Sequence, residues 1–467
     1  MRSTYIILYS VTLVIQKGIL DFCTPLLWLV IDCFFLIELV NVLCDWFVLM
    51  GFVLRRRAIE APFLFLLITL AFSCGQKNQY KLNQSVAELR NCADDQMLSP
   101  VKEANLRKTI NAEEKTEQIE AIIQQKVRGG LNGNVLVAQK GIILYKHCFG
   151  LAHFEKNTRD SLIEESKFQL ASLSKTFTAI AVLKLQESGK VAFTDSIQRF
   201  FPDFPYHGIS IRDLLSHRSG LPNYVYSFDD SMKVNYYRKE PKLPTNADIM
   251  HWFATVKPTP KKYNVPGRGF SYNNTNYMVL AAIVEKVTKQ PFADYLRRTI
   301  FLPLGMHNTY IATTKNDSIN LFRTAGYQMH RRIPKDYFDN VIGDKGVYST
   351  IGDLFRWYRA LNGDCLLSRK ALSEAFIPRS FERKGLRNYG YGFRIQLDAL
   401  SQPEFIYHTG WWKGYNTMFW FSPKDEYVII ILGNRLNSTV YRVQELIDIL
   451  RQSPKKGLDG VDGEVEI

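Results

Sequence analysis

A serine and a lysine three residues apart can serve as a nucleophile and its base, because on a helix this spacing places both side chains on one face. The chain contains three such pairs: Ser99–Lys102, Ser172–Lys175 and Ser453–Lys456. In the first and third pairs the serine precedes a proline within a polar segment. Ser172 instead opens an apolar helical pattern over residues 171–190. We therefore expect Ser172 to be the nucleophile and Lys175, held away from water, to take its proton.

Two further motifs carry groups that could assist a serine nucleophile. A Tyr-x-Asn sequence occurs once, as Tyr272-Asn273-Asn274, in a loop before the helical pattern of residues 277–289. A His-x-Gly sequence also occurs once, as His408-Thr409-Gly410, at the end of the strand-like segment EFIYHTG. Taken singly, a tyrosine in such a loop is more often a turn residue, and a histidine at a turn is more often structural.

In chain order, the three motifs resemble those of the serine penicillin-recognising hydrolases: class C beta-lactamases, D-alanyl-D-alanine carboxypeptidases, and related esterases and D-aminopeptidases. The segments LLSHRSGLPNY (214–224), LPLGMHNT (302–309) and KGVYSTIGDL (345–354) strengthen this resemblance, which extends over about residues 115–450. It implies a beta-lactamase/transpeptidase-like α+β fold and a reaction through an acyl-enzyme.

The resemblance implies a role for each matching residue. Ser172 would attack a carbonyl carbon, Lys175 would accept the serine proton, and Tyr272 would pass that proton to the leaving group. The backbone N–H groups of Ser172 and Trp411 would form an oxyanion hole. Asn274 would hydrogen-bond the substrate's amide. The residues expected to bind the substrate are Asn274, His408, Thr409, Gly410 and Trp411.

The third motif departs from the family pattern. Most beta-lactamases of this type carry Lys-Thr-Gly, which this chain lacks, and His-Thr-Gly is more similar to the motif of carboxypeptidases and D-aminopeptidases. Trp411 stands where a small hydroxyl residue often helps to bind a substrate carboxylate, and with Trp412 it can form a wall of the site. We expect a serine hydrolase of small esters, amides or D-amino-acid peptides. A D-alanyl-D-alanine carboxypeptidase, a weak beta-lactamase, and a non-catalytic penicillin-binding or scaffold relative are the alternatives.

Strand-like segments at both ends of this region flank a helical middle. GNVLVAQKGIILYKHCFG (133–150) predicts two strands around a tight turn. Near the C-terminus, EFIYHTG, NTMFWFSP and EYVIIILGN predict three more, followed by a helix over residues 440–451. The segments YMVLAAIVEKVTK and DLFRWYRAL between them have helical periodicity. This pattern predicts an antiparallel sheet flanked by helices and completed by distant segments, with an inserted α-helical subdomain.

The N-terminal residues indicate targeting to the cell envelope. From Met50 the chain has a basic start, an apolar core over residues 62–72 and small residues before Cys74. This resembles a bacterial lipoprotein signal, with Cys74 as the lipidated residue. We expect translation to start at Met50 and the mature protein to be lipid-anchored, facing the periplasm. The alternative is an integral membrane protein anchored through its N-terminal apolar segment.

These patterns divide the chain into five segments. They are an apolar extension (1–49), the signal (50–73), a polar tether (74–113), the hydrolase domain (114–452) and a disordered tail (453–467). The tether and the tail are polar and lack sustained apolar periodicity.

Charge and cysteine usage argue against other classes of protein. The net charge is +14, but the lysines and arginines are scattered, with only short runs such as residues 55–57 and 261–262. Without a nucleic-acid-binding motif beside them, we expect no nucleic-acid partner. None of the seven cysteines forms a CxxC pair, so the sequence predicts neither a disulfide framework nor a zinc site. We expect no cofactor, and as partners only a small ester, amide or peptide substrate and the membrane.

Overall fold

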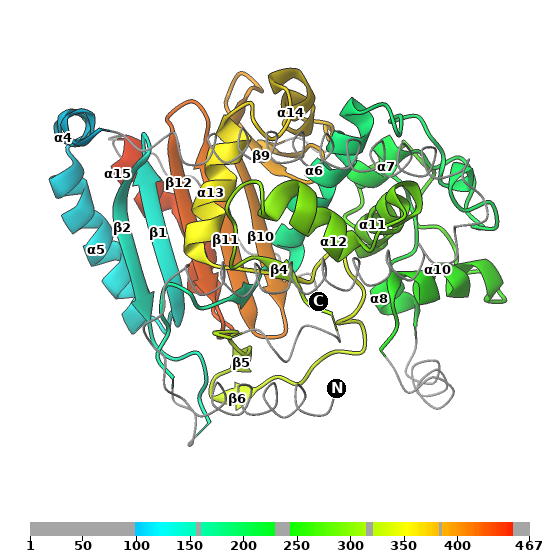
Figure 1. Cartoon of the computed structure of the whole chain (residues 1–467), viewed down its shortest axis with the longest axis horizontal. Coiled ribbons are helices and arrows are strands. Elements are labelled where there is room, and N and C mark those ends of the chain that lie inside the picture. Colours follow the sequence, from blue (N-terminus) through cyan, green and yellow to red (C-terminus); the bar gives the residue numbers. More distant parts are fainter. Residues whose placement is uncertain (1–98, 156–159, 229–242, 314–320, 383–384, 452–467) are drawn as a thin grey trace, which may run out of the picture. The chain divides into compact units, whose positions relative to one another are not determined.

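A seven-stranded antiparallel sheet is the framework of the fold (Figure 1). The structure is a computed structural model that describes residues 99–155, 160–228, 243–313, 321–382 and 385–451. All of these residues belong to one unit, residues 84–467. The strand order is β2-β1-β12-β11-β10-β9-β8. The bounds are β1 Gly133–Gln139, β2 Ile142–Phe149, β8 Arg387–Tyr389, β9 Arg394–Leu397, β10 Pro403–Trp412, β11 Tyr415–Ser422 and β12 Tyr427–Gly433.

Helices and two small sheets complete the described structure. The α-helices are α4 Pro100–Thr109, α5 Ala112–Arg128, α6 Ser174–Glu187, α7 Ile211–Leu215, α8 Tyr224–Ser227, α10 Asn246–Thr255, α11 Asn274–Thr288, α12 Phe292–Leu296, α13 Ile351–Asn362, α14 Arg369–Ala375 and α15 Gln444–Arg451. The 3-10 helices are η2 Ala171–Leu173, η3 Ile197–Arg199 and η5 Ser438–Tyr441, and η4 Arg297–Phe301 is a π-helical turn. The short strands are β3 Phe168–Gln169, β4 Tyr310–Ile311, β5 Tyr327–Gln328, β6 Arg331–Arg332 and β7 Val347–Ser349.

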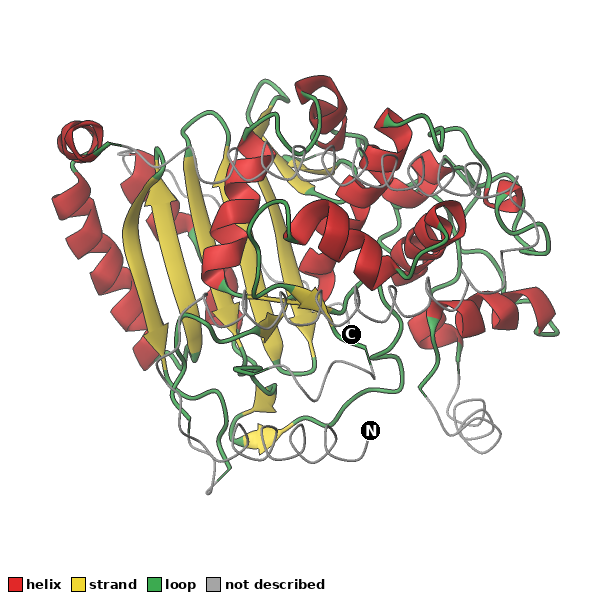
Figure 2. Cartoon of the chain, in the orientation of Figure 1, coloured by secondary structure: helices red, strands yellow, loops and turns green. Residues whose placement is uncertain are grey.

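Strand β12 shows that both faces of the sheet are covered. Val428, Ile430 and Leu432 belong to the larger core, which includes residues of α6, α11 and α13. Ile429 and Ile431 belong to a second core, formed with α5 and α15. Successive strand residues face opposite sides, so burial of both faces explains why this strand is apolar throughout. The predicted antiparallel sheet flanked by helices is confirmed (Figure 2).

Segments from the two ends of the described chain meet in the middle of this sheet. Strand β1 pairs along its length with β12, from Gly133 opposite Gly433 to Gln139 opposite Tyr427. Between them in the chain, residues 197–301 contribute helices and no named strand where they are described. The sheet completed by distant segments and the inserted helical subdomain both follow the prediction.

Residues 100–109 differ from the predicted polar tether, because they form helix α4. Ser99 caps this helix: its side chain accepts a hydrogen bond from the backbone N–H of Lys102 at 3.4 Å. None of the residues of α4 is buried, so the sequence has no apolar periodicity here that would predict a helix. The first Ser-x-x-Lys pair is therefore the spacing of a helix cap.

Two further elements differ from the expected pattern. The C-terminal helix starts at Gln444, because residues 438–441 form the 3-10 helix η5. Strands β8 and β9 were not anticipated, since they have only three and four residues. No helix in the described ranges is long and apolar enough to cross a bilayer. The predicted extension, signal, Cys74 and tail lie outside the described residues, as do Ser453 and Lys456.

Candidate active site

The lysine of the central motif is buried beside the serine. Ser172 lies in η2, directly before α6, and its Oγ is 3.0 Å from Nζ of Lys175. The same Nζ donates hydrogen bonds to Oδ1 of Asn274 at 2.8 Å and to the backbone O of Asp344 at 3.0 Å. Lys175 is fully buried, and no carboxylate among the described residues forms an ion pair with it. The structure therefore brings Ser172, Lys175 and Asn274 together.

Tyr272 contacts the lysine through its ring. The Lys175 Nζ lies 4.9 Å from the centroid of the Tyr272 ring. The guanidinium of Arg394 lies 5.0 Å from the same centroid. The Tyr272 hydroxyl is buried and makes no hydrogen bond to any part of the chain that the structure describes. A substrate could therefore use this hydroxyl without displacing a protein partner.

His217 positions the Tyr272 loop. Its Nδ1 accepts a hydrogen bond from the backbone N–H of Asn273 at 3.1 Å. The centroid of its ring lies 4.4 Å from the ring centroid of Tyr272 and 4.8 Å from that of Tyr389. Burial, followed by the charge of Lys175, holds the pKa of His217 well below its usual value. The imidazole is thus a neutral packing group at the edge of the site.

Strand β10 approaches the nucleophile because of a glycine. A Cβ added at Gly410 would lie 2.1 Å from the backbone O of Leu170, two residues before Ser172. The same Leu170 oxygen accepts a hydrogen bond from Oγ1 of Thr417 at 2.9 Å. Strand β9 pairs with β10 only as far as Tyr407, so from residue 408 onwards β11 is its only neighbouring strand of the described sheet. The end of β10 therefore presents a free edge near Ser172.

His408 is not among the residues that line the cavity at Ser172. It is fully buried, with Nδ1 2.7 Å from the backbone O of Thr409 and Nε2 3.3 Å from the hydroxyl of Tyr389. Burial, and then the charges of Arg394 and Lys175, hold the pKa of His408 well below its usual value. The side chain is neutral at neutral pH and offers no cation to a substrate. Its predicted role in substrate binding stays a prediction; in this structure the side chain is buried beside Tyr389.

A cavity of about 210 Å³ opens at Ser172. Of the predicted site residues, it is lined by Ser172, Tyr272, Asn274, Thr409 and Trp411. The lining residues that no motif predicted are Ala171, Val225, Tyr226, Asp344, Lys345 and Arg394. Trp412 also lines it, so both tryptophans form walls as expected, whereas His408 and Gly410 lie behind the lining.

An internal ion pair connects the cavity wall to Lys175. Nζ of Lys345 lies 3.4 Å from Oδ2 of Asp344 and 2.5 Å from the hydroxyl of Tyr224. The Tyr224 hydroxyl donates to the same Asp344 oxygen at 2.8 Å. Lys345 also lies 5.2 Å from the Trp412 ring centroid. Because the backbone O of Asp344 accepts from Lys175, this network fixes both the wall and the position of the base.

The arrangement is suited to acyl transfer. It places a serine hydroxyl beside an amine, a free tyrosine hydroxyl and a guanidinium in one small cavity. Within the described ranges, no three His, Cys, Asp or Glu side chains gather as a metal site would require.

The two buried histidines predict a loss of stability in acid. Below about pH 6.5 the unfolded chain binds protons that the folded histidines resist, so the free energy of unfolding falls as the pH falls. Each histidine contributes up to about 1.4 kcal/mol per pH unit. We expect urea unfolding between about pH 5 and pH 7.5 to show this slope, and His408→Asn to reduce it. His251→Asn, at an exposed position in α10, is the control. An equal slope in wild type and His408→Asn would contradict the prediction.

Comparisons with known proteins agree with this geometry. A family model described as Beta-lactamase matches residues 117–452. Penicillin-binding protein 4* of Bacillus subtilis (strain 168) is 34% identical over 324 residues, covering 66% of this chain and 69% of that protein. Protein flp of Staphylococcus aureus (strain MRSA252) is 26% identical over 337 residues, covering 69% of this chain but only 63% of protein flp.

A solved structure confirms the predicted fold. A class C beta-lactamase matches with a TM-score of 0.60 at 19% identity, over 74% of this chain and 99% of the other. At 19% identity, the similarity to this solved structure shows only that the two chains share a fold. Membership of the family is shown by the family model. The chain therefore belongs to the beta-lactamase family of serine hydrolases.

Proposed function

We propose that the chain hydrolyses small amides, esters or D-amino-acid peptides at the cell envelope, and that its preferred substrates carry a carboxylate near the scissile bond. The observation that carries this proposal is the 3.0 Å approach of Ser172 Oγ to Lys175 Nζ in a cavity lined by Arg394. The pair supplies a nucleophile and a base, and the guanidinium supplies a partner for an anionic substrate.

The partners of Lys175 favour its action as a base. The carbonyl oxygens of Asn274 and Asp344 can only accept hydrogen bonds, whereas the Ser172 hydroxyl can also donate one. The Ser172 hydroxyl is therefore the partner of Nζ from which the base could take a proton. Ser172 Oγ attacks the carbonyl carbon as its proton moves to Lys175. Tyr272 passes a proton to the leaving group, and water then hydrolyses the acyl-enzyme.

Arg394 supports a carboxylate-bearing substrate. His408 is neutral, and Trp411 replaces the small hydroxyl residue that often assists carboxylate binding in this family. Arg394 lines the same cavity as Thr409 and Trp411, so its guanidinium can take over that interaction. This keeps D-alanyl-D-alanine-type peptides among the substrates, which Trp411 alone argued against.

A weak beta-lactamase activity is the second candidate. A relative is named as a penicillin-binding protein, and a structural neighbour is named as a class C beta-lactamase. Trp411, 37% exposed, lines the cavity in which an acyl-enzyme would meet its attacking water. We expect penicillin to acylate Ser172 and the adduct to persist, which would distinguish a peptidase or esterase from an efficient beta-lactamase.

Covalent labelling tests the nucleophile. We expect intact-mass spectrometry of the full chain to show one adduct with a fluorescent penicillin or a fluorophosphonate, and none on Ser172→Ala. Ser99→Ala is the matched control, because it removes the serine of another Ser-x-x-Lys pair that only caps a helix. Folded wild-type protein that takes up neither probe would instead support a non-catalytic relative.

Substitution of Arg394 tests the carboxylate preference. With an acylated D-alanyl-D-alanine substrate we expect Arg394→Gln to lower kcat/KM roughly 10- to 100-fold, through loss of a charge-assisted hydrogen bond. Arg394→Lys should retain part of the activity. Hydrolysis of the corresponding C-terminal amide should change little, and Arg369→Gln, an exposed arginine in α14, should behave as wild type. Equal losses on the acid and the amide would contradict carboxylate recognition.

We also propose that Cys74 carries a lipid anchor that holds the enzyme at the periplasmic side of the membrane. The support is the resemblance of residues 50–74 to a lipoprotein signal. In a bacterial host we expect labelled fatty acid to be incorporated into wild type and not into Cys74→Ala, with Cys92→Ala as the control cysteine. Membrane association that is resistant to detergent and survives Cys74→Ala would favour an integral N-terminal anchor.

A further inference from the structure

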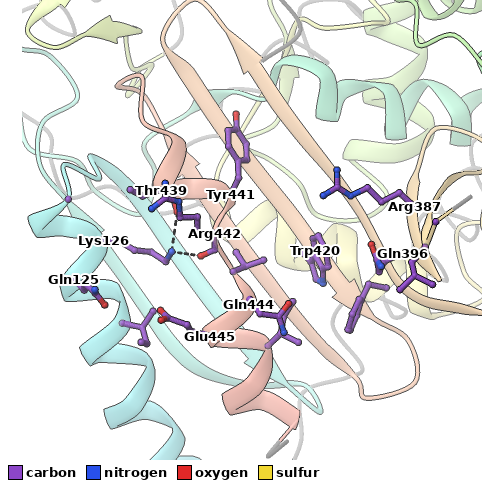
Figure 3. A pocket seen from close by; sticks show the side chains of 17 residues that line it. Gln125, Lys126, Arg387, Gln396, Trp420, Thr439, Tyr441, Arg442, Gln444 and Glu445 are labelled. Carbon is purple, nitrogen blue, oxygen red and sulfur yellow. Dashed lines mark hydrogen bonds between the residues drawn. The ribbon is translucent and has the colours of Figure 1, made fainter. Parts of the chain in front are cut away.

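A second, larger cavity lies on the face of the sheet that carries α5 and α15. It has a volume of about 950 Å³, within the range typical of small-molecule sites. The strands β8 and β9 contribute Arg387 and Gln396 to its lining (Figure 3). Phe405 of β10 also lines it. Register places these three side by side, since Gln396 pairs with both Arg387 and Phe405. The helices α5 and α15 and the 3-10 helix η5 also contribute to the lining.

The cavity is apolar in its interior. Phe405, Trp420 and Tyr441 are aromatic lining residues, each at most 6% exposed. Ile122 of α5 and Ile447 of α15 add aliphatic surface. A ligand with an apolar or aromatic body would bury its surface against these side chains.

Two polar atoms in the lining have no partner. The indole Nε1 of Trp420 and the hydroxyl Oγ1 of Thr439 are both buried and make no hydrogen bond to the described residues. Trp420 is 2% exposed, and its N–H can only donate. A buried donor left unpaired is costly, so a ligand oxygen that reached it after a small shift of the neighbouring side chains would stabilise it.

The charged groups at the rim are mainly positive. Arg387 and Arg442 are exposed and line the cavity together with Lys126, while Glu445 is its only acidic lining residue among those described. Lys126 is already engaged, since its Nζ donates to the backbone oxygens of Thr439 and Arg442. Burial lowers the pKa of Lys126 to about 8. Arg387 and Arg442 are the exposed cations of the lining.

We propose that this cavity is a second ligand site, separate from the catalytic one, that binds an organic anion with an apolar or aromatic body. The anionic group would face Arg387 and Arg442, and the body would lie against Phe405 and Tyr441. An oxygen of the ligand would accept from the unpaired Trp420 N–H.

This site can be tested by measuring the binding of 4-phenylbutyrate to the full chain with calorimetry and saturation-transfer NMR. We expect saturable binding, with 4-phenylbutanamide at least roughly tenfold weaker because it lacks the charge. The double variant Arg387→Gln with Arg442→Gln should weaken 4-phenylbutyrate by a similar factor. Arg369→Gln should bind as wild type. Acylation of Ser172 by penicillin should leave the affinity unchanged.

A second variant guards against effects on folding. Trp420→Phe keeps an aromatic ring but removes the N–H donor, and its unfolding midpoint can be compared with that of wild type. We expect it to weaken both ligands several-fold, because the carboxylate and the amide each have an oxygen that can accept the indole N–H. Equal affinity for acid and amide, no effect of the arginine substitutions, or loss of binding when Ser172 is acylated would each overturn the proposal.

Discussion

The position of one buried amine constrains the whole site. The three oxygens around Lys175 come from η2, from the start of α11 and from the loop before β7. These segments are far apart in the chain, so the amine is satisfied only when the helical subdomain and the sheet are both in place. The backbone adapts to the same junction at Gly392, where a Cβ would lie 3.0 Å from the backbone O of Lys175 and 2.4 Å from Cβ of Ala179. The geometry of the site therefore depends on the packing of the helical subdomain against the sheet.

The electrostatics of the site follow from what is buried with the amine. Burial lowers the pKa of His217 and of His408, and the charge of Lys175 lowers both further, so both side chains are neutral. The remaining positive groups are Arg394, which lies against the Tyr272 ring, and Lys345, which is neutralised by Asp344. Arg394 lines the cavity at Ser172 from β9, the strand that neighbours the third motif of β10.

The sequence predicted the parts of the fold that have strong periodicity. Helices α6, α11 and α13 and strands β1, β2, β10, β11 and β12 carry long apolar patterns, and they lie where those patterns placed them. Helix α4 was not predicted because none of its residues is buried, so it has no apolar face. Strand β9 was not predicted because four residues are too few to show an alternating apolar pattern.

The same reasoning explains which site residues were found. Ser172, Lys175, Tyr272 and Asn274 belong to motifs in which spacing along the chain reflects chemistry, and the structure brings them together. Arg394 lines the cavity because β9 pairs with β10. That pairing could not be predicted from the spacing of residues along the sequence. His408 was assigned to the substrate because it stands in a motif, but its burial depends on how helices and strands pack around it.

The pairing of β1 with β12 also bears on how the protein is made. The first strand of the large sheet can pair with β2 at once, but its other neighbour, β12, is made only after almost the whole domain has been synthesised, and closing so long a loop slows folding. Until then β1 carries an open edge of the kind that promotes association between chains. A message truncated shortly before β12 would therefore remove the middle of the sheet, and not its border, from the finished enzyme.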